Sequence, residues 1–128
     1  MIKQVIVMRR DLGMRRGKQI AQGAHASLKV FLDRKIPPSE VGLNGNVLII
    51  PMPEDMAAWA NGLFTKITVQ VSSEEDLLAV HKAALEADLP VALIQDAGKT
   101  EFGGVPTYTC LAVGPAQAED VDKVTGHL

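Results

Sequence analysis

Short apolar runs alternate with amphipathic segments along this chain. Apolar runs rich in β-branched residues at 3–8, 66–71, 91–94 and 107–113 predict four strands. Apolar positions at helical spacing predict helices over about 18–35, 53–60 and 73–85, and a last helix through Asp120 and Val124. Strands separated by helices are typical of an α/β sandwich, so we predict a single domain whose sheet is covered by helices on both faces.

Residues that favour turns and helix ends set the limits of these elements. Pro37 and Pro38 end the first long helix, and Gly62 is suited to end the second. Ser72 or Ser73 is expected to cap the third. The segment 36–53 is unusual, because a strong turn signal at 43–46 is followed by a short apolar run at 47–50.

The first long helix has two chemically different sides. At about 100° per residue, one narrow stripe is polar and the opposite stripe is apolar. The polar stripe consists of Lys18, Gln22, His25 and Lys29, and the apolar stripe consists of Ile20, Ala24, Leu28 and Phe31. A lysine, an amide and an imidazole near a helix N-terminus have the chemistry of a site that handles an anion.

A second candidate loop follows the third predicted strand. It contains Asp96, Lys99 and Thr100. If the first and third strands are parallel, both loops leave the sheet at the same end, and Asp96 lies near Lys18. The alternative is a turn aspartate whose side chain accepts a hydrogen bond from its own backbone two residues on.

Composition and motif spacing exclude several classes of protein. The chain is 47% hydrophobic and 22% charged, with no apolar run near the roughly 18–20 residues that span a bilayer. We therefore expect a cytoplasmic protein with no membrane partner. The only cysteine, Cys110, excludes an internal disulfide. The glycine-containing loop at 13–19 is one residue too short for a nucleotide phosphate loop, and Gln19 replaces the hydroxyl that would bind a metal.

Positive charge is concentrated at the N-terminus. Residues 1–18 hold six basic residues and one acidic residue, a net charge of +5, whereas the whole chain carries −2. The remaining residues therefore carry −7. An acidic body with one basic segment indicates a local site for a polyanion, although the charges could also be merely solvated.

Several strings in this sequence resemble the type II peptidyl-tRNA hydrolases of archaea and eukaryotes. The matching strings lie, in the family's order, at 9–12, 14–18, 21–26, 93–101, 113–115 and 124–128, together with Trp59, Gly62 and Lys66. The resemblance implies a four-stranded mixed sheet, a homodimer, and no metal or organic cofactor. It also implies an activity, which is hydrolysis of the ester that joins a nascent peptide to the terminal ribose of peptidyl-tRNA.

The family's functional residues fall on matching positions of this chain. The resemblance assigns catalysis to Lys18, Gln22, His25, Asp96 and Thr100, and it places Gln95 in the same site. We expect Asp96 and Thr100 to orient a water, and Lys18 to stabilise the oxyanion. The residues expected to contact tRNA phosphates are Arg9, Arg10, Arg15 and Arg16, with Lys99 where the family more often has arginine.

The sequence also departs from the family in ways that leave alternatives open. Gly23 stands where the family usually has cysteine or another small side chain, and the segment 36–53 is longer and more apolar than usual. One alternative is an RNA-binding protein on the same scaffold without hydrolytic activity. Another reading, compatible with either function, is that 47–50 forms an edge that contacts a partner or a second copy.

Overall fold

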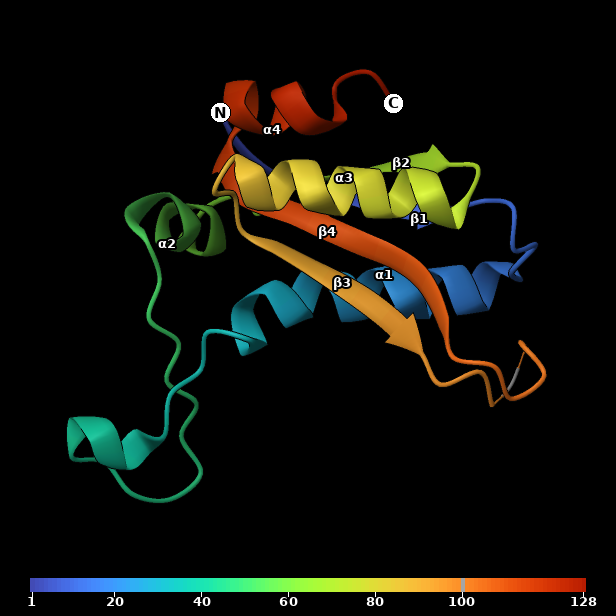
Figure 1. Cartoon of the computed structure of the whole chain (residues 1–128). Coiled ribbons are helices and arrows are strands. Elements are labelled where there is room, and N and C mark those ends of the chain that lie inside the picture. The colour runs from blue at the N-terminus through green and yellow to red at the C-terminus, as the bar shows by residue number, and fades with distance from the viewer. Residues whose placement is uncertain (100) are drawn as a thin grey trace.

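The structure is a computed structural model that describes residues 1–99 and 101–128. It contains the predicted alternation of strands and helices (Figure 1). In chain order the elements are β1 (Ile2–Arg9), α1 (Arg16–Leu32), the 3-10 helix η1 (Pro38–Val41), α2 (Glu54–Asn61), β2 (Lys66–Val71), α3 (Glu74–Glu86), β3 (Val91–Asp96), β4 (Thr107–Gln117) and α4 (Ala118–Thr125). None of the helices in the described part of the chain combines the length and apolarity needed to span a membrane.

The four strands form one mixed sheet in the order β2-β1-β4-β3. Strand β1 pairs in parallel with β2, whereas β4 runs antiparallel to both β1 and β3. Strands β1, β2 and β3 therefore point in the same direction, and their C-terminal ends lie at the same end of the sheet. The predicted fold class is confirmed.

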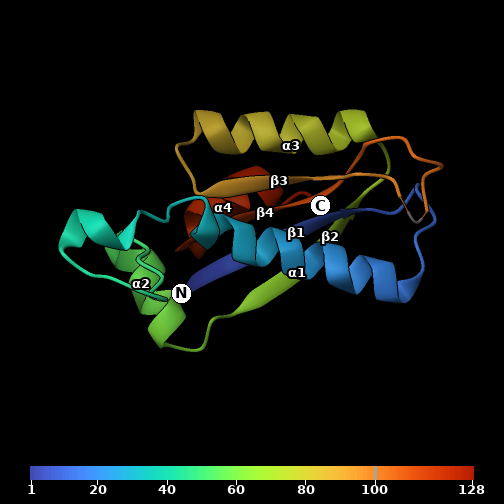
Figure 2. The same ribbon diagram turned by 90° about the horizontal axis from the view of Figure 1, so that it is seen from below.

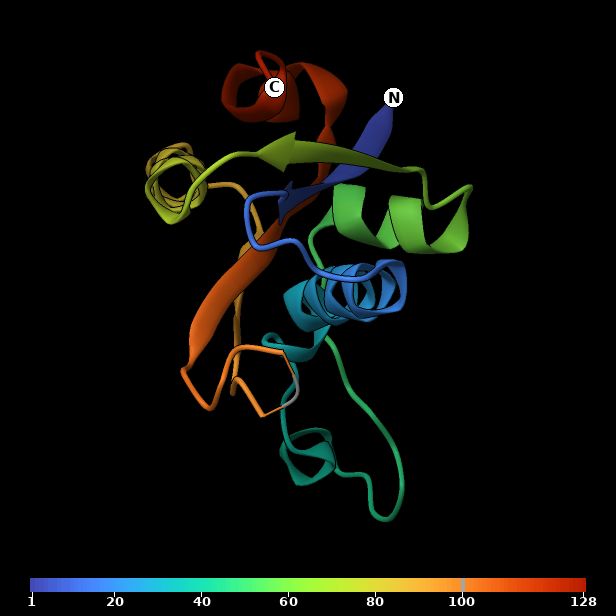
Figure 3. The same cartoon turned by 90° about the vertical axis from the view of Figure 1, so that its right-hand side faces the viewer.

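Helices cover both faces of the sheet (Figures 2 and 3). Alternate residues of β1 point to opposite faces, so Val5 and Val7 pack with α3 and α4, while Ile6 and Met8 pack on the side of α1 and α2. Ser73 caps α3 by accepting a hydrogen bond from the backbone N–H of Asp76, as one of the two predicted caps.

Helix α1 packs on the sheet through an unusual face. Its buried residues are Gln22, Gly23, Ala26 and Val30. Two residues of its apolar stripe instead face solvent, since Ile20 is 66% exposed and Leu28 is 56% exposed, whereas Phe31 is partly buried and stacks on Trp59. On the other face of the sheet, Leu85 of α3 is 57% exposed.

The segment 36–53 is the part of the chain that packs least on the rest, and we call it the arm. No residue of the arm is buried. The apolar run at 47–50 forms no strand, and its one sheet-like contact is an isolated bridge between Ile36 and Ile49. The arm projects beyond the C-terminal end of α1 (Figure 1).

Candidate active site

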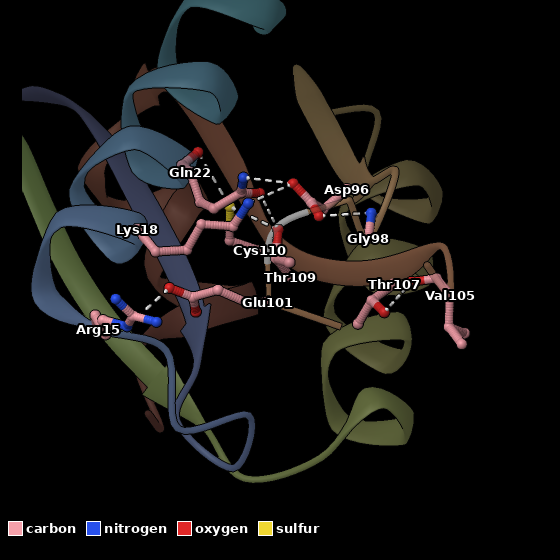
Figure 4. A network of polar contacts seen from close by, with 10 residues as sticks. All are labelled: Arg15, Lys18, Gln22, Asp96, Gly98, Glu101, Val105, Thr107, Thr109 and Cys110. Atoms are coloured by element: carbon pink, nitrogen blue, oxygen red, sulfur yellow. Dashed lines mark hydrogen bonds and ion pairs between the residues drawn. The ribbon is translucent and has the colours of Figure 1, made fainter. Parts of the chain in front are cut away.

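An ion pair joins the two loops that the sequence analysis singled out. Lys18 lies in the first turn of α1, and Asp96 is the last residue of β3. Their Nζ and Oδ1 atoms are 2.7 Å apart, and both side chains are largely shielded from solvent (Figure 4). The expectation that parallel strands bring Asp96 near Lys18 is confirmed.

Two further donors hold the Asp96 carboxylate in place. Gln22 Nε2 donates to Oδ1 over 3.2 Å, and the backbone N–H of Gly98 donates to Oδ2 over 2.8 Å. The bond from the Gly98 N–H is the turn-aspartate interaction that the sequence analysis gave as the alternative role of Asp96. Asp96 therefore stabilises the turn and also forms the ion pair. Gly98 has a φ of +81°, and a Cβ there would lie 2.2 Å from the carbonyl oxygen of Val105, so the turn requires glycine.

These contacts shift the titration of Asp96. The hydrogen bond from Lys18, followed by that from the Gly98 N–H, holds the pKa of the Asp96 carboxyl below its ordinary value, whereas burial acts in the opposite direction. Asp96 is therefore ionised at neutral pH. A carboxylate with a lowered pKa is a weak base, but it orients a water or a cation well.

Thr109 is part of this network, although the sequence analysis did not identify it. It is fully buried, and its Oγ1 donates a short hydrogen bond to Gln22 Oε1. Because the amide oxygen accepts from Thr109 and the amide nitrogen donates to Asp96, the orientation of the Gln22 amide is fixed at both ends. The register of the strands explains why Thr109 was missed: Ile94 pairs with Cys110 and Gln95 pairs with Tyr108, so Thr109 lies in a bulge. A bulge redirects side chains in a way that simple alternation does not predict.

The neighbouring Cys110 is inert at neutral pH. Its Sγ donates to the backbone carbonyl of Gln22 over 3.2 Å, which helps to hold α1 against β4. Burial raises the pKa of the Cys110 thiol to about 11, so the group remains protonated.

The other residues assigned to catalysis have different positions. His25 lies on the exposed surface of α1, and among the described residues no hydrogen bond links it to Lys18 or Asp96. Gln95 is exposed beside Asp96 on β3. Thr100 lies outside the described residues.

Of the residues expected to contact phosphates, Arg9 differs from expectation. Its side chain is only 10% exposed, its Nε and Nη2 donate to the Asp11 carboxylate, and its Nη1 donates to the carbonyl of Tyr108. Arg9 thus fastens the end of β1 to β4. Because these bonds occupy its guanidinium donors, few donors remain for a ligand.

The other basic residues expected to contact phosphates lie on the surface. Arg10, Arg15, Arg16 and Lys99 are all exposed. Arg10 Nε donates to Ser72 Oγ over 2.9 Å. Arg15 Nε lies 3.6 Å from Glu101 Oε1 (Figure 4). The described residues contain no group of three or more histidine, cysteine or acidic side chains that could hold a metal ion.

The fold and this geometry define a small α/β protein whose polar site lies where parallel strands end. Comparison with known proteins places it more closely. The family model described as peptidyl-tRNA hydrolase PTH2 matches residues 2–128. The chain is 37% identical over 127 residues to a peptidyl-tRNA hydrolase of Methanocaldococcus jannaschii, covering 99% of this chain and 97% of the relative. It is 41% identical over 128 residues to one of Methanopyrus kandleri, covering 100% and 97%. The chain belongs to the PTH2 family of peptidyl-tRNA hydrolases.

The lowered pKa of Asp96 predicts how stability depends on pH. Because the folded-state pKa lies below the unfolded value of about 3.9, the stabilisation by Asp96 is present above about pH 4 and is lost as the pH falls further. We expect the difference in unfolding free energy between wild type and Asp96→Asn to be constant from pH 7 to 5 and to shrink below pH 4. Urea unfolding over this range measures it, and a difference that already changes between pH 7 and 5 would contradict the assignment.

The bond from Thr109 predicts a second effect. Thr109→Val keeps the shape but removes the donor to Gln22, which leaves a buried amide oxygen unsatisfied at a cost of about 1–3 kcal/mol. A loosened Gln22 also weakens its bond to Asp96, so the pKa of Asp96 should rise toward its ordinary value. Carboxyl 13C NMR titration measures this change. Thr109→Ser retains the donor and should leave that pKa in place, and an equal rise in both variants would exclude the positioning role.

Proposed function

We propose that this protein hydrolyses the ester of peptidyl-tRNA and releases the peptide and free tRNA. The observation that carries the proposal is the shielded Lys18–Asp96 pair, in a chain that matches the PTH2 family over residues 2–128. The peptidyl-tRNA hydrolases of M. jannaschii and M. kandleri are aligned over nearly their whole lengths. Because this substrate arises in translation, we place the reaction in the cytoplasm.

In the proposed mechanism, a water attacks the ester directly, without a covalent enzyme intermediate. The water oxygen bonds to the carbonyl carbon and gives up one proton, the bond to the ribose oxygen breaks, and the ribose oxygen takes up one proton. The products are the peptide acid and free tRNA. Asp96 orients the water, with help from Thr100, and the Lys18 ammonium stabilises the negative charge that develops on the carbonyl oxygen. Since the pKa of Asp96 is lowered, electrostatic stabilisation contributes more to the rate than proton abstraction.

The other polar side chains of the site position Asp96 or contact the substrate. Gln22 restrains Asp96 through its amide, and Thr109 restrains Gln22. His25 is exposed on α1 and Gln95 is exposed on β3, the two elements that carry the pair, which suits contacts with substrate. Exposed Arg10, Arg15, Arg16 and Lys99 bind tRNA phosphates without reading sequence, while Arg9 has a structural role.

A homodimer forms, in our proposal, through a groove between α1 and β2. The groove has a volume of about 810 Å³, and its apolar lining includes Ile20, Leu28, Phe31 and Phe64. Strand β2 is an edge strand whose polar residues Thr68 and Gln70 line the other side of the groove. An exposed apolar helix stripe beside an open sheet edge is typical of a surface that is covered by another chain.

Substitution of the paired residues tests the hydrolase function. Wild type should cleave N-acetyl-aminoacyl-tRNA without added metal, whereas Lys18→Ala and Asp96→Asn should each lower kcat at least about 100-fold, because each removes a charge that acts at the reacting centre. A filter assay at low salt should show that tRNA binding is retained. Turnover by both variants within about twofold of wild type would contradict the mechanism. Absence of cleavage by folded wild type that still binds tRNA would favour a non-catalytic RNA-binding protein.

The dimer has its own test in sedimentation velocity. Wild type should sediment as a dimer, and Ile20→Glu should sediment as a monomer because it places a charge in the apolar groove. Leu85→Glu is the matched control, since Leu85 is also exposed but lies on α3, on the opposite face of the sheet. A monomeric wild type, or an Ile20→Glu variant that remains dimeric, would exclude this interface.

A further inference from the structure

The arm exposes apolar side chains that the protein itself does not cover. Those with large exposed fractions are Val41 at 51%, Leu43 at 44%, Val47 at 44%, Leu48 at 59% and Met52 at 39%. The bridge between Ile36 and Ile49 holds the two halves of the arm together, and Arg34 Nε donates to the carbonyl of Pro51 at its base. An ordered segment with an apolar surface gains free energy when a ligand removes that surface from water.

The arm and the ion pair lie at opposite ends of one helix. Lys18 is in the first turn of α1, and the arm begins just after its last turn (Figures 1 and 2). Lys18 and Leu32 are 14 residues apart, which corresponds to about 21 Å along the helix axis. An extended peptide advances by about 3.3 Å per residue, so six or seven residues span that distance.

The arm and the N-terminal end of α1 differ in charge in the same way as the two parts of the substrate. Exposed Arg10 and Arg15 precede α1, exposed Arg16 begins it, and exposed Lys99 follows β3. The arm has one ionisable side chain, Glu40, and no basic residue. A polyanion is therefore attracted to the end with the ion pair, and an uncharged, apolar chain suits the arm.

The surface of α1 provides a track between the two ends. Ala21 and His25 are exposed, and helical spacing places them within about 60° of Lys18 around the helix axis. The dimer groove begins beside this track, because Ala24 and Leu28 line the near edge of the groove, whereas Ile20 and Ser27 line it from the other side of α1. The His25 imidazole, about 10 Å along the axis from Lys18, can form hydrogen bonds with a peptide backbone.

We propose that the arm binds an apolar segment of the substrate's peptide, six to eight residues from the ester, after that peptide has followed α1 past His25. The inference rests on the hydrolase function proposed above. It makes this protein selective for peptidyl-tRNAs whose peptides are long enough to reach the arm and apolar where they contact it.

A series of substrates tests this selectivity. Peptidyl-tRNAs with N-acetylated peptides of one, three, six and nine residues are prepared in two forms, one with leucine and valine and one with serine and glycine beyond the third residue. For wild type, kcat/KM should rise about tenfold between three and nine residues for the apolar form, and less than about twofold for the polar form. A tenfold gain requires burial of only about 55 Å² of apolar surface.

Variants assign the effect to the arm. The double variant Val41→Ser/Leu48→Ser should lose the rise with length but cleave the one-residue substrate as fast as wild type. Leu85→Ser is the matched control, since it removes an equally exposed apolar side chain far from the arm, and it should retain the rise.

The outcomes separate the two proposals. Failure of wild type to cleave the one-residue substrate would contradict the hydrolase function itself. Cleavage of that substrate without any dependence on length, or the same dependence in the arm variant and in Leu85→Ser, would overturn the role of the arm. A shift of the arm variant from dimer to monomer, with the length dependence intact, would assign the arm to assembly and also overturn it.

Discussion

The site depends on one ion pair, between Lys18 and Asp96, and that pair depends on the direction of two strands. Strand β4 lies between β1 and β3 and runs antiparallel to both, so β1 and β3 must end on the same side of the sheet. The loop after β1 leads into α1 with Lys18 in its first turn, and β3 ends at Asp96. A change in the direction of β3 would separate the two charges.

Local patterns in the sequence were sufficient to predict the framework of the fold. Four strands, the helix ended by Gly62 and the cap at Ser73 lie where apolar periodicity and capping residues place them. The juxtaposition of Lys18 and Asp96 was predicted on the condition that the first and third strands are parallel, and the sheet meets that condition. The helices, strands and caps follow from interactions between residues close in sequence, whereas the direction of β1 and β3 depends on their pairing with β4.

Other features depend on contacts that no local pattern contains. Thr109 reaches Gln22 because a bulge breaks the alternation of β4, and the sequence does not mark that bulge. Arg9 resembles its basic neighbours in sequence, but Asp11 and the Tyr108 carbonyl hold it in the interior. The apolar stripe of α1 was predicted from the sequence, but its exposure was not. Because α1 buries the side that carries Gln22, Ile20 and Leu28 on the opposite side face solvent.

Lys18 and Asp96 act as one unit in the proposed mechanism, and a double-mutant cycle measures the coupling between them. The measurement is kcat/KM on N-acetyl-aminoacyl-tRNA for wild type, Lys18→Met, Asp96→Asn and the double variant. If the two groups act together, the double variant is no more than about threefold slower than the slower single variant. Losses that multiply in the double variant would show that the two residues act independently and would contradict the account.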